Sequence, residues 1–302
     1  MSDPQTTPSP IIFDRALVRR HRRRAAALGE ATFLLDRVAE DMADRLAAVL
    51  RRFDVAIDLG TPGEAVRAAL ARLGSIGTII ASDAVPRRRP AVIADEEALP
   101  FGDGTFDLVV SALALHHVND LPGTLVQIRR ALKPDGLFVA ALFGGETLTE
   151  LRQSFAAAES EVDGGVSPRV APFADLRDLG ALLQRAGFAL PVTDVDRVCV
   201  RYNSAFDLMR DLRRMGATNA LVARRRQPLR RATVMRMAAI YGERFADADG
   251  RLRATFEIVW LSGWAPHPSQ QQPLKPGTAK SRLAEALGTR EISTGEKSRK
   301  VG

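Results

Sequence analysis

The sequence has one cysteine, Cys199, among its 302 residues. A single cysteine cannot form a disulfide within the chain, and this usage fits a reducing compartment. No apolar stretch approaches the roughly 20 residues that cross a bilayer, and none follows the basic cluster near the start. We therefore expect neither a transmembrane segment nor a secretory signal. We expect a cytoplasmic bacterial protein, at most peripheral to the inner membrane.

Aromatic residues are also scarce, at 6% of the chain, whereas arginine rather than lysine carries most of the positive charge behind the net +7. Nucleic-acid binders commonly interleave basic residues with aromatic side chains on which bases stack, and the basic runs here lack them. We expect no specific nucleic-acid binding. Such runs can also attract an acidic protein or an anionic membrane surface. The three runs are residues 19–24, 87–89 and 224–231.

The chain does contain a regular alternation of apolar strands and helical segments from residue 55 to residue 143. This alternation predicts a mostly parallel α/β sheet with helices on both faces. A helical insert, residues 203–254, separates the last two strands and is far longer than a hairpin loop needs. We expect it to cover the ligand cleft. The elements predicted outside the core are helices over 13–24, 31–52, 146–161 and 174–186, and strands over 193–202 and 255–265.

This pattern also predicts the domain boundaries. We expect a disordered leader over residues 1–12 and one domain over 13–265, with its core at 54–145. From residue 266 the chain is rich in proline, glutamine, lysine and glycine, which predicts an extended tail to residue 302 with one short helix near 281–287.

Acidic residues end three consecutive strands of the predicted sheet: Asp58, Asp83 and Asp95. The carboxyl ends of parallel strands meet at one edge, where doubly wound sheets bind nucleotides, so these acids should lie close together. A lone acid at a strand end more often caps a helix or a turn. Three at successive strand ends favour nucleotide binding.

The segments VAIDLGTPGEAV, GTIIASD, ADEEALPF and FDLVVSALALHHV lie between residues 55 and 118. Together they resemble the core of a class I S-adenosylmethionine (SAM) dependent methyltransferase, of the type 11 methyltransferase domain. The resemblance implies a seven-stranded sheet with SAM as cofactor. It implies that Asp58 holds the glycine loop or the methionine amino group, Asp83 the ribose hydroxyls and Asp95 the adenine amine. The other implied cofactor contacts are Gly60, Gly63, Glu96, Ser111 and His116.

The flanking segments resemble a narrower group, the complex I assembly factor 5 and malonyl-carrier-protein methyltransferase-like proteins. These segments are residues 143–152, 167–188 and 202–221, and the tail GWAPHPSQQQPLKPGTAKSRL resembles the assembly-factor branch. The resemblance implies modification of a protein substrate, a peripheral complex I subunit, by methylation or SAM-dependent arginine hydroxylation. Two alternatives stay open. One is a non-catalytic assembly factor that keeps the fold, and the other is a malonyl-carrier-protein O-methyltransferase, whose acidic carrier would suit a basic surface.

The glycine loop departs from the usual Asp-Leu-Gly-x-Gly-x-Gly pattern. Gly60 is kept, Pro62 and Glu64 replace the second and third glycines, and Gly63 lies between them. Proline fixes φ near −65° and removes an amide donor, while Glu64 adds a negative charge near the ligand's carboxylate. We expect weaker SAM binding than in relatives with three glycines, and tighter binding when Pro62 and Glu64 are both replaced by glycine.

Other chemistry has little support in the sequence. The adjacent His116 and His117 point in different directions, and no cysteine or acid lies at metal-ligand spacing, so we expect no metal site. No Gly-x-Ser-x-Gly elbow is present, which argues against nucleophilic hydrolysis. No catalytic residue is assigned, since methyl transfer needs positioning more than acid–base chemistry.

The insert region carries polar residues that are candidates for substrate recognition. Helix capping and surface pairing explain such residues equally well. The oligomeric state is not indicated by any feature of the sequence. The candidates are Tyr202, Asp211, Arg213 and Asn219.

Overall fold

The computed structural model describes residues 11–85, 92–270 and 288–289. The described residues up to His267 belong to one compact unit, and those from Pro268 onward to a second. Residues 1–10 of the predicted leader and the predicted helix at 281–287 lie outside the described residues. None of the described helices is both long and apolar enough to span a membrane.

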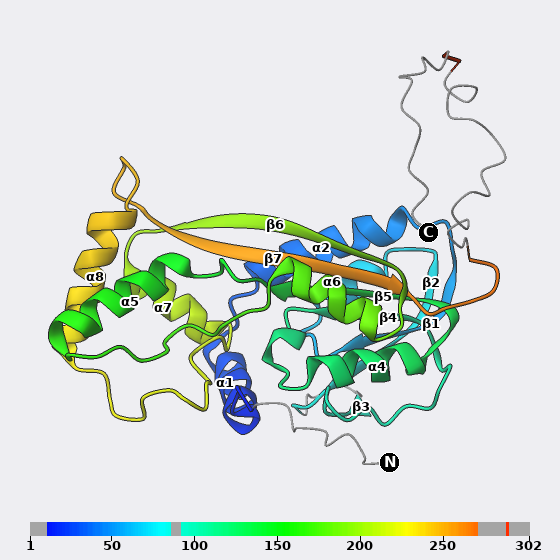
Figure 1. The fold of residues 1–302 in the computed structure, drawn as a ribbon, viewed down its shortest axis with the longest axis horizontal. Helices are drawn as coiled ribbons and strands as arrows, with labels where there is room; N and C mark the ends of the chain where they lie inside the picture. The colour runs from blue at the N-terminus through cyan, green and yellow to red at the C-terminus, as the bar shows by residue number, and fades with distance from the viewer. Residues whose placement is uncertain (1–10, 86–91, 271–287, 290–302) are drawn as a thin grey trace, which may run out of the picture. The chain divides into compact units, whose positions relative to one another are not determined.

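A seven-stranded sheet in the order β3-β2-β1-β4-β5-β7-β6 forms the centre of the first unit (Figure 1). The pairs from β3 to β5 are parallel, and β7 runs antiparallel to both β5 and β6. This confirms the predicted mostly parallel sheet with a helical insert before the last strand. The strands are β1 (Phe53–Leu59), β2 (Ile76–Asp83), β3 (Val92–Ile93), β4 (Phe106–Ala112), β5 (Leu132–Phe143), β6 (Ala189–Tyr202) and β7 (Leu252–Trp264).

Helices cover both faces of the sheet, and this is why the central strands read as continuous apolar runs. On one face α2 (Phe33–Ala47) and α3 (Ala65–Leu70) pack on β1, β4 and β5. On the other face α4 (Leu121–Ala131) and α6 (Leu176–Arg185) pack on the same strands. The long predicted helix is therefore α2, whose Val38 and Met42 are fully buried.

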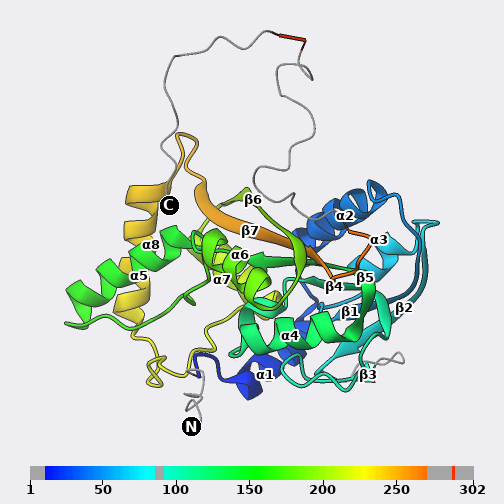
Figure 2. The same ribbon diagram turned by 45° about the vertical axis from the view of Figure 1, so that its right-hand side comes forward.

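The insert between β6 and β7 has a hydrophobic core of its own. It contains α7 (Ala205–Arg214) and α8 (Arg231–Phe245), which bury apolar residues together with α5 (Thr149–Val162). Figure 2 shows these three helices gathered at one end of the long strands β6 and β7. The insert leaves the sheet at Tyr202 and returns at Leu252, which face each other across the β6–β7 pair.

Helix α1 (Arg15–Leu28) joins the sheet edge to the segment that follows α7. The side chain of Asp14 caps its start by accepting from Leu17 N at 3.0 Å. The Asp14 amide donates to Ala220 O at 2.8 Å. The Phe13 amide donates to Asn119 Oδ1 at 2.7 Å. The predicted basic helix is therefore held on both sides of the cleft at the carboxyl edge of the sheet.

Candidate functional site

The ends of β1 and β2 meet the glycine loop at the carboxyl edge of the sheet. Gly60 has φ +71°, which only glycine adopts freely. Its amide donates to Ser82 O at 2.6 Å, so the chain turns sharply beside the end of β2. A Cβ atom at Gly60 would lie 2.6 Å from Glu96 Oε1. Gly60 is therefore required both by the turn and by the close approach of Glu96.

Asp58 is buried beneath this loop. Its Oδ2 accepts from Arg67 Nη1 at 2.7 Å, and Arg67 Nη2 donates to Gly63 O at 2.9 Å. Burial raises the pKa of Asp58 to about 6, although Thr61 and Arg67 oppose the rise. Through Arg67, Asp58 ties the end of β1 to the loop.

The acids at the edge are paired with one face of α1. Arg15, Arg19 and Arg22 occupy helix positions i, i+4 and i+7, and we call them the α1 arginines. Arg15 Nη2 lies 2.7 Å from Asp95 Oδ1, and Arg19 pairs with the other oxygen of Asp95. Arg15 also pairs with Glu96 and Glu97. This spacing was present in the sequence, but the α1 arginines were not among the predicted site residues.

Arg22 lies deepest of the three, between the acids and the loop. Its Nη1 is 3.7 Å from Asp83 Oδ1 and 3.6 Å from Glu96 Oε1. The same nitrogen donates to Gly60 O at 3.2 Å. Asp83 and Glu96 are both buried, at 5% and 3% exposure. A cavity of about 10 Å³ lies between the α1 arginines and Glu96.

This donor set is chemically suited to the adenosine part of SAM. Buried carboxylates at strand ends are the groups that accept hydrogen bonds from ribose hydroxyls in doubly wound folds. Asp83 lies at the end of β2 and Glu96 lies against Gly60. To accept hydrogen bonds from adenosine, the two carboxylates would have to be shared or released by Arg22.

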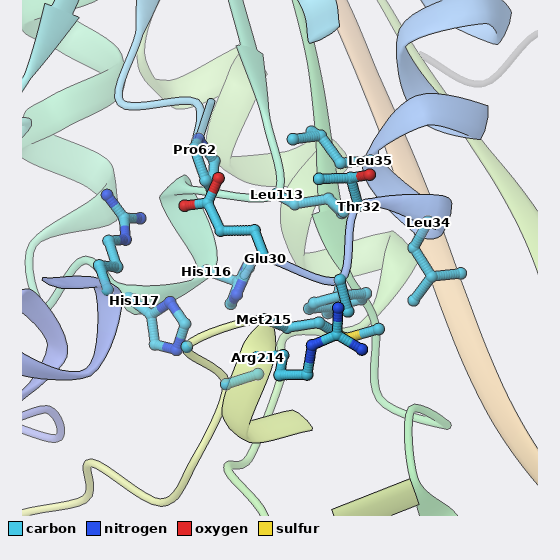
Figure 3. Close-up of a pocket in the computed structure, with 15 residues that line it drawn as sticks. Glu30, Thr32, Leu34, Leu35, Pro62, Leu113, His116, His117, Arg214 and Met215 are labelled. Carbon is cyan, nitrogen blue, oxygen red and sulfur yellow. The ribbon is translucent and has the colours of Figure 1, made fainter. Parts of the chain in front are cut away.

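A small cavity of about 60 Å³ lies beside the glycine loop (Figure 3). Its walls include the turn before α2, the loop after β1, the end of α7, Arg22 of α1 and the histidines after β4. We call it the small cavity. The residues that line it include Arg22, Glu30, Pro62, His116, Arg214 and Met215.

A large cavity of about 240 Å³ adjoins the small cavity and extends beneath the insert. The two share His116, His117, Phe143, Met215 and Ala217 as lining residues. Apolar side chains dominate its walls, and five of them are phenylalanines. The polar groups of the lining are fewer, as in many small-molecule sites. The aromatic residues are Phe13, Phe143, Phe155, Phe173 and Phe256, and the polar ones include Thr147, Arg169, Arg213 and Asn219.

His116 and His117 stand between the two cavities, in a short 3-10 turn after β4 (Leu115–His117). Their ring centroids are 4.2 Å apart, and the His116 ring lies 4.8 Å from that of Phe143. Burial, and then the Arg22 charge, lowers the pKa of His116 to about 3. Burial and His116 hold the pKa of His117 well below its usual value. Both rings are therefore neutral near pH 7, and their apolar setting suits stacking rather than ion pairing.

The other predicted site residues are divided between the cavities and the protein interior. Arg213 and Asn219 line the large cavity, and Asn219 Nδ2 donates to Pro168 O at 2.8 Å. Tyr202 and Asp211 line neither cavity. Burial and the Asp211 carboxylate raise the pKa of Tyr202. Ser111 is fully buried, and its hydroxyl donates to Leu59 O at 2.7 Å.

Comparisons with known proteins indicate the family to which the chain belongs. A family model described as a methyltransferase domain matches residues 57–140. The human protein "Arginine-hydroxylase NDUFAF5, mitochondrial" is 42% identical over 294 residues, covering 93% of this chain and 85% of its own. The Danio rerio protein of the same name is 41% identical over 286 residues, covering 91% and 89%. The malonyl-[acyl-carrier protein] O-methyltransferase of Methylovorus sp. is 36% identical over 280 residues, covering 86% and 92%.

Among solved structures, the YcgJ protein from Bacillus subtilis superposes with a TM-score of 0.51 at 15% identity. The match covers 76% of this chain and 99% of that chain. At this identity it supports the fold alone.

Proposed function

This chain belongs to the class I methyltransferase family that includes the NDUFAF5 arginine hydroxylases and the malonyl-[acyl-carrier protein] O-methyltransferases, and from that membership we propose that it binds SAM and modifies a protein side chain. The observation that carries the proposal is the adjoining pair of cavities. One lies at the glycine loop and the other lies beneath the insert. A cofactor in the first would face an acceptor in the second.

The residues proposed to hold the cofactor are those at the strand ends. Asp83 and Glu96 would accept from the ribose hydroxyls, and Asp95 from the adenine amine, once the α1 arginines share them. Gly60 and Gly63 would allow close approach at the loop, since both have positive φ. When bound, SAM supplies a methyl group already activated on a sulfonium.

The large cavity is proposed to receive the acceptor. Its aromatic walls exclude water, and the neutral histidines between the cavities do not repel a cationic side chain. Arg169, a half-buried charged residue of its wall, is compensated by the fully buried Glu159. These features support an arginine side chain as acceptor, in agreement with the name of the human and fish relatives.

The two candidate reactions, hydroxylation and methylation, differ in the reagents that they consume. Hydroxylation replaces a C–H bond by C–OH, and with dioxygen as the oxygen source it consumes two electrons and two protons from a reductant and releases one water. Methylation moves a methyl group to a nucleophile while the sulfonium C–S bond breaks. Mass spectrometry of the modified protein would separate a gain of one oxygen from a gain of one methylene.

A second candidate function is O-methylation of a malonyl carrier. The observation that favours it is Arg213, which lines the large cavity and has no ion-pair partner among the described residues. A guanidinium at this position would attract a substrate carboxylate. A carboxylate acceptor has no proton to lose, which suits a cavity with neutral histidines. Arg213→Gln should then slow modification of the carrier but not of an arginine-bearing protein.

The cofactor assignment is tested by titrating S-adenosylhomocysteine into the protein by calorimetry. Asp83→Ala removes a charged acceptor and should weaken binding about ten- to a hundredfold, or about 1.5–3 kcal/mol. Asp103→Ala is the matched control, because Asp103 pairs with Arg130 on the surface. Unchanged affinity in Asp83→Ala would remove Asp83 from the cofactor site.

The proposed partner is a peripheral subunit of respiratory complex I, met at the cytoplasmic face of the inner membrane. The basic run 224–231 is a candidate for speeding this encounter, because such runs can attract an acidic partner. Arg224, Arg225 and Arg230 instead make ion pairs within the chain, with Asp14 and Asp163. Arg226 and Arg231 are exposed and remain candidates for the partner surface.

Replacing Arg226 and Arg231 by alanine, rather than deleting the run, therefore tests the partner without breaking the ion pairs. We expect slower, less salt-sensitive capture of complex I subunits from lysate. Capture of no complex I subunit by wild type, together with methylation of a malonyl carrier, would contradict the assembly role.

A further inference from the structure

The small cavity beside the glycine loop is lined by two side chains of opposite charge that no role above uses. Glu30 approaches from the turn before α2, and Arg214 from the end of α7 (Figure 3). The third charged residue of the wall, Arg22, is engaged by Asp83, Glu96 and the Gly60 carbonyl. Besides Arg22, the wall of the small cavity therefore carries one acidic and one basic side chain.

Glu30 approaches the Gly63 side of the loop from the turn before α2. Its Oε2 lies 3.8 Å from the position that a Cβ atom would take on Gly63. Figure 3 shows its carboxylate directed toward Pro62. Glu64, expected from the sequence to charge this region, is exposed and lines neither cavity. The acidic group in the wall of the small cavity thus comes from a residue more than thirty positions earlier in the chain than the loop.

Arg214 is held to the same turn that carries Glu30. Its Nε donates to Gly29 O at 2.7 Å, and its carbonyl accepts from Ala31 N at 3.3 Å. Its Nη1 also lies 3.8 Å from Asp211 Oδ1. The turn at 29–31 and the end of α7 therefore form one frame that carries both charges. Groups fixed in this way lose little side-chain entropy when they bind a ligand.

We propose that Glu30 and Arg214 bind the ammonium and the carboxylate of the cofactor's methionine end, an inference that rests on the proposed SAM binding. An α-amino acid carries these opposite charges on two groups bonded to the same carbon, and charge-assisted hydrogen bonds to each are stronger than neutral ones. The pair compensates for Pro62, which cannot donate an amide hydrogen to the carboxylate. It also makes the site specific for ligands that carry the amino-acid group.

Three adenosine ligands separate the two charges by calorimetry. S-adenosylhomocysteine carries both groups, decarboxylated SAM carries only the ammonium, and 5′-methylthioadenosine carries neither. Arg214→Met should weaken S-adenosylhomocysteine about tenfold or more and leave the other two within about twofold of wild type. Glu30→Gln should weaken the first two and leave 5′-methylthioadenosine unchanged.

Matched controls come from the same elements. Arg210→Met removes an exposed arginine of α7, and Glu64→Gln removes the exposed acid of the loop. Both should bind all three ligands as wild type does. Arg214→Lys, which keeps a positive charge, should recover part of the lost affinity.

The outcomes are distinct for the two proposals. Equal weakening of all three ligands in Arg214→Met would show that Arg214 only holds the turn, and would overturn the inference. Unchanged S-adenosylhomocysteine affinity in both variants would overturn it as well. No binding of any ligand by the wild-type protein would instead defeat the proposed cofactor.

Discussion

The two ends of the cleft are lined by different kinds of side chain. At the adenosine end three arginines of α1 face four acids, and a cavity of about 10 Å³ lies among the described residues there. Beyond the histidines lies a cavity of about 240 Å³ with aromatic walls. A ligand at the first end must exchange one set of ionic partners for another. A ligand at the second end enters a space already shaped by packing.

Burial shifts the pKa values of titratable groups at both ends, but in opposite directions. It raises the pKa of Asp58 to about 6 and lowers that of His116 to about 3. Each group is thereby kept closer to its neutral form. The charged form of Asp58 appears at high pH and that of His116 at low pH, so the two ends lose stability in different pH ranges.

The largest expected effect concerns the aromatic wall. Phe155 is 5% exposed, on α5. Phe155→Ala should lower the free energy of unfolding by about 3–5 kcal/mol, because it removes a buried ring and enlarges a cavity. Phe206→Ala is the control, since Phe206 on α7 is 43% exposed, and should cost less than about 1 kcal/mol. Equal losses in denaturant titrations would show that the wall adds no stability of its own.

Asp58→Asn tests the buried acid at the other end. Between the usual pKa of 3.8 and the folded value of about 6, the folded state holds a proton that the unfolded chain has lost. Wild-type stability should therefore fall as pH rises through this window, by about 3 kcal/mol in total. The variant lacks this loss. The difference in the free energy of unfolding between the two proteins should therefore grow from pH 4 to pH 7 and then stay level. A constant difference would mean that Asp58 is ionised throughout.

The corresponding test at the histidines is His116→Asn. The unfolded chain takes up a proton near pH 6.5, whereas the folded ring stays neutral down to a pKa of about 3. Wild-type stability contributed by the neutral ring is therefore present above pH 6.5 and is lost as pH falls. At pH 5 the free energy of unfolding of the wild type should have fallen by about 2 kcal/mol relative to that of the variant. Parallel pH profiles of the two proteins would contradict the depressed pKa.

The smallest effect is expected at the loop. Pro62→Gly restores an amide donor worth about 0.5–1.5 kcal/mol and adds a flexible residue that costs about 0.5–1 kcal/mol. S-adenosylhomocysteine affinity should rise by no more than a fewfold. Adding Glu64→Gly should change little, because Glu64 is exposed. A large gain in either variant would show that Pro62 or Glu64 blocks the ligand directly.

The sheet and its acidic edge could be predicted because their signals are local. Asp58 and Asp83 follow apolar runs, and parallel strands bring such ends together. Asp58 pairs with the nearby Arg67, whereas the arginine partners of Asp83 and Asp95 come from α1, far away in sequence. Their i, i+4, i+7 spacing indicates one helix face, but not which acids that face meets.

The insert side of the site was harder to predict for a different physical reason. Tyr202 and Asp211 are polar residues of the insert region, as Arg213 and Asn219 are, yet only the latter two line the large cavity. Which side of α7 faces the cavity depends on packing against α5 and α8. Glu30 reaches the loop only because Gly29 ends α1 and turns the chain toward α2. No sequence spacing encodes such a contact between elements.

The pairing of Tyr202 with Leu252 also bears on how proteins of this fold can diverge. Because the segment between them departs from and rejoins the sheet at one pair of facing residues, its length can change without altering the register of β6 and β7. The entropic cost of closing such a segment grows only slowly with its length. Insertions, deletions or whole replacements can therefore accumulate there over generations while the nucleotide edge of the sheet keeps its sequence. One ancestral scaffold could in this way acquire new acceptors by exchanging a single segment.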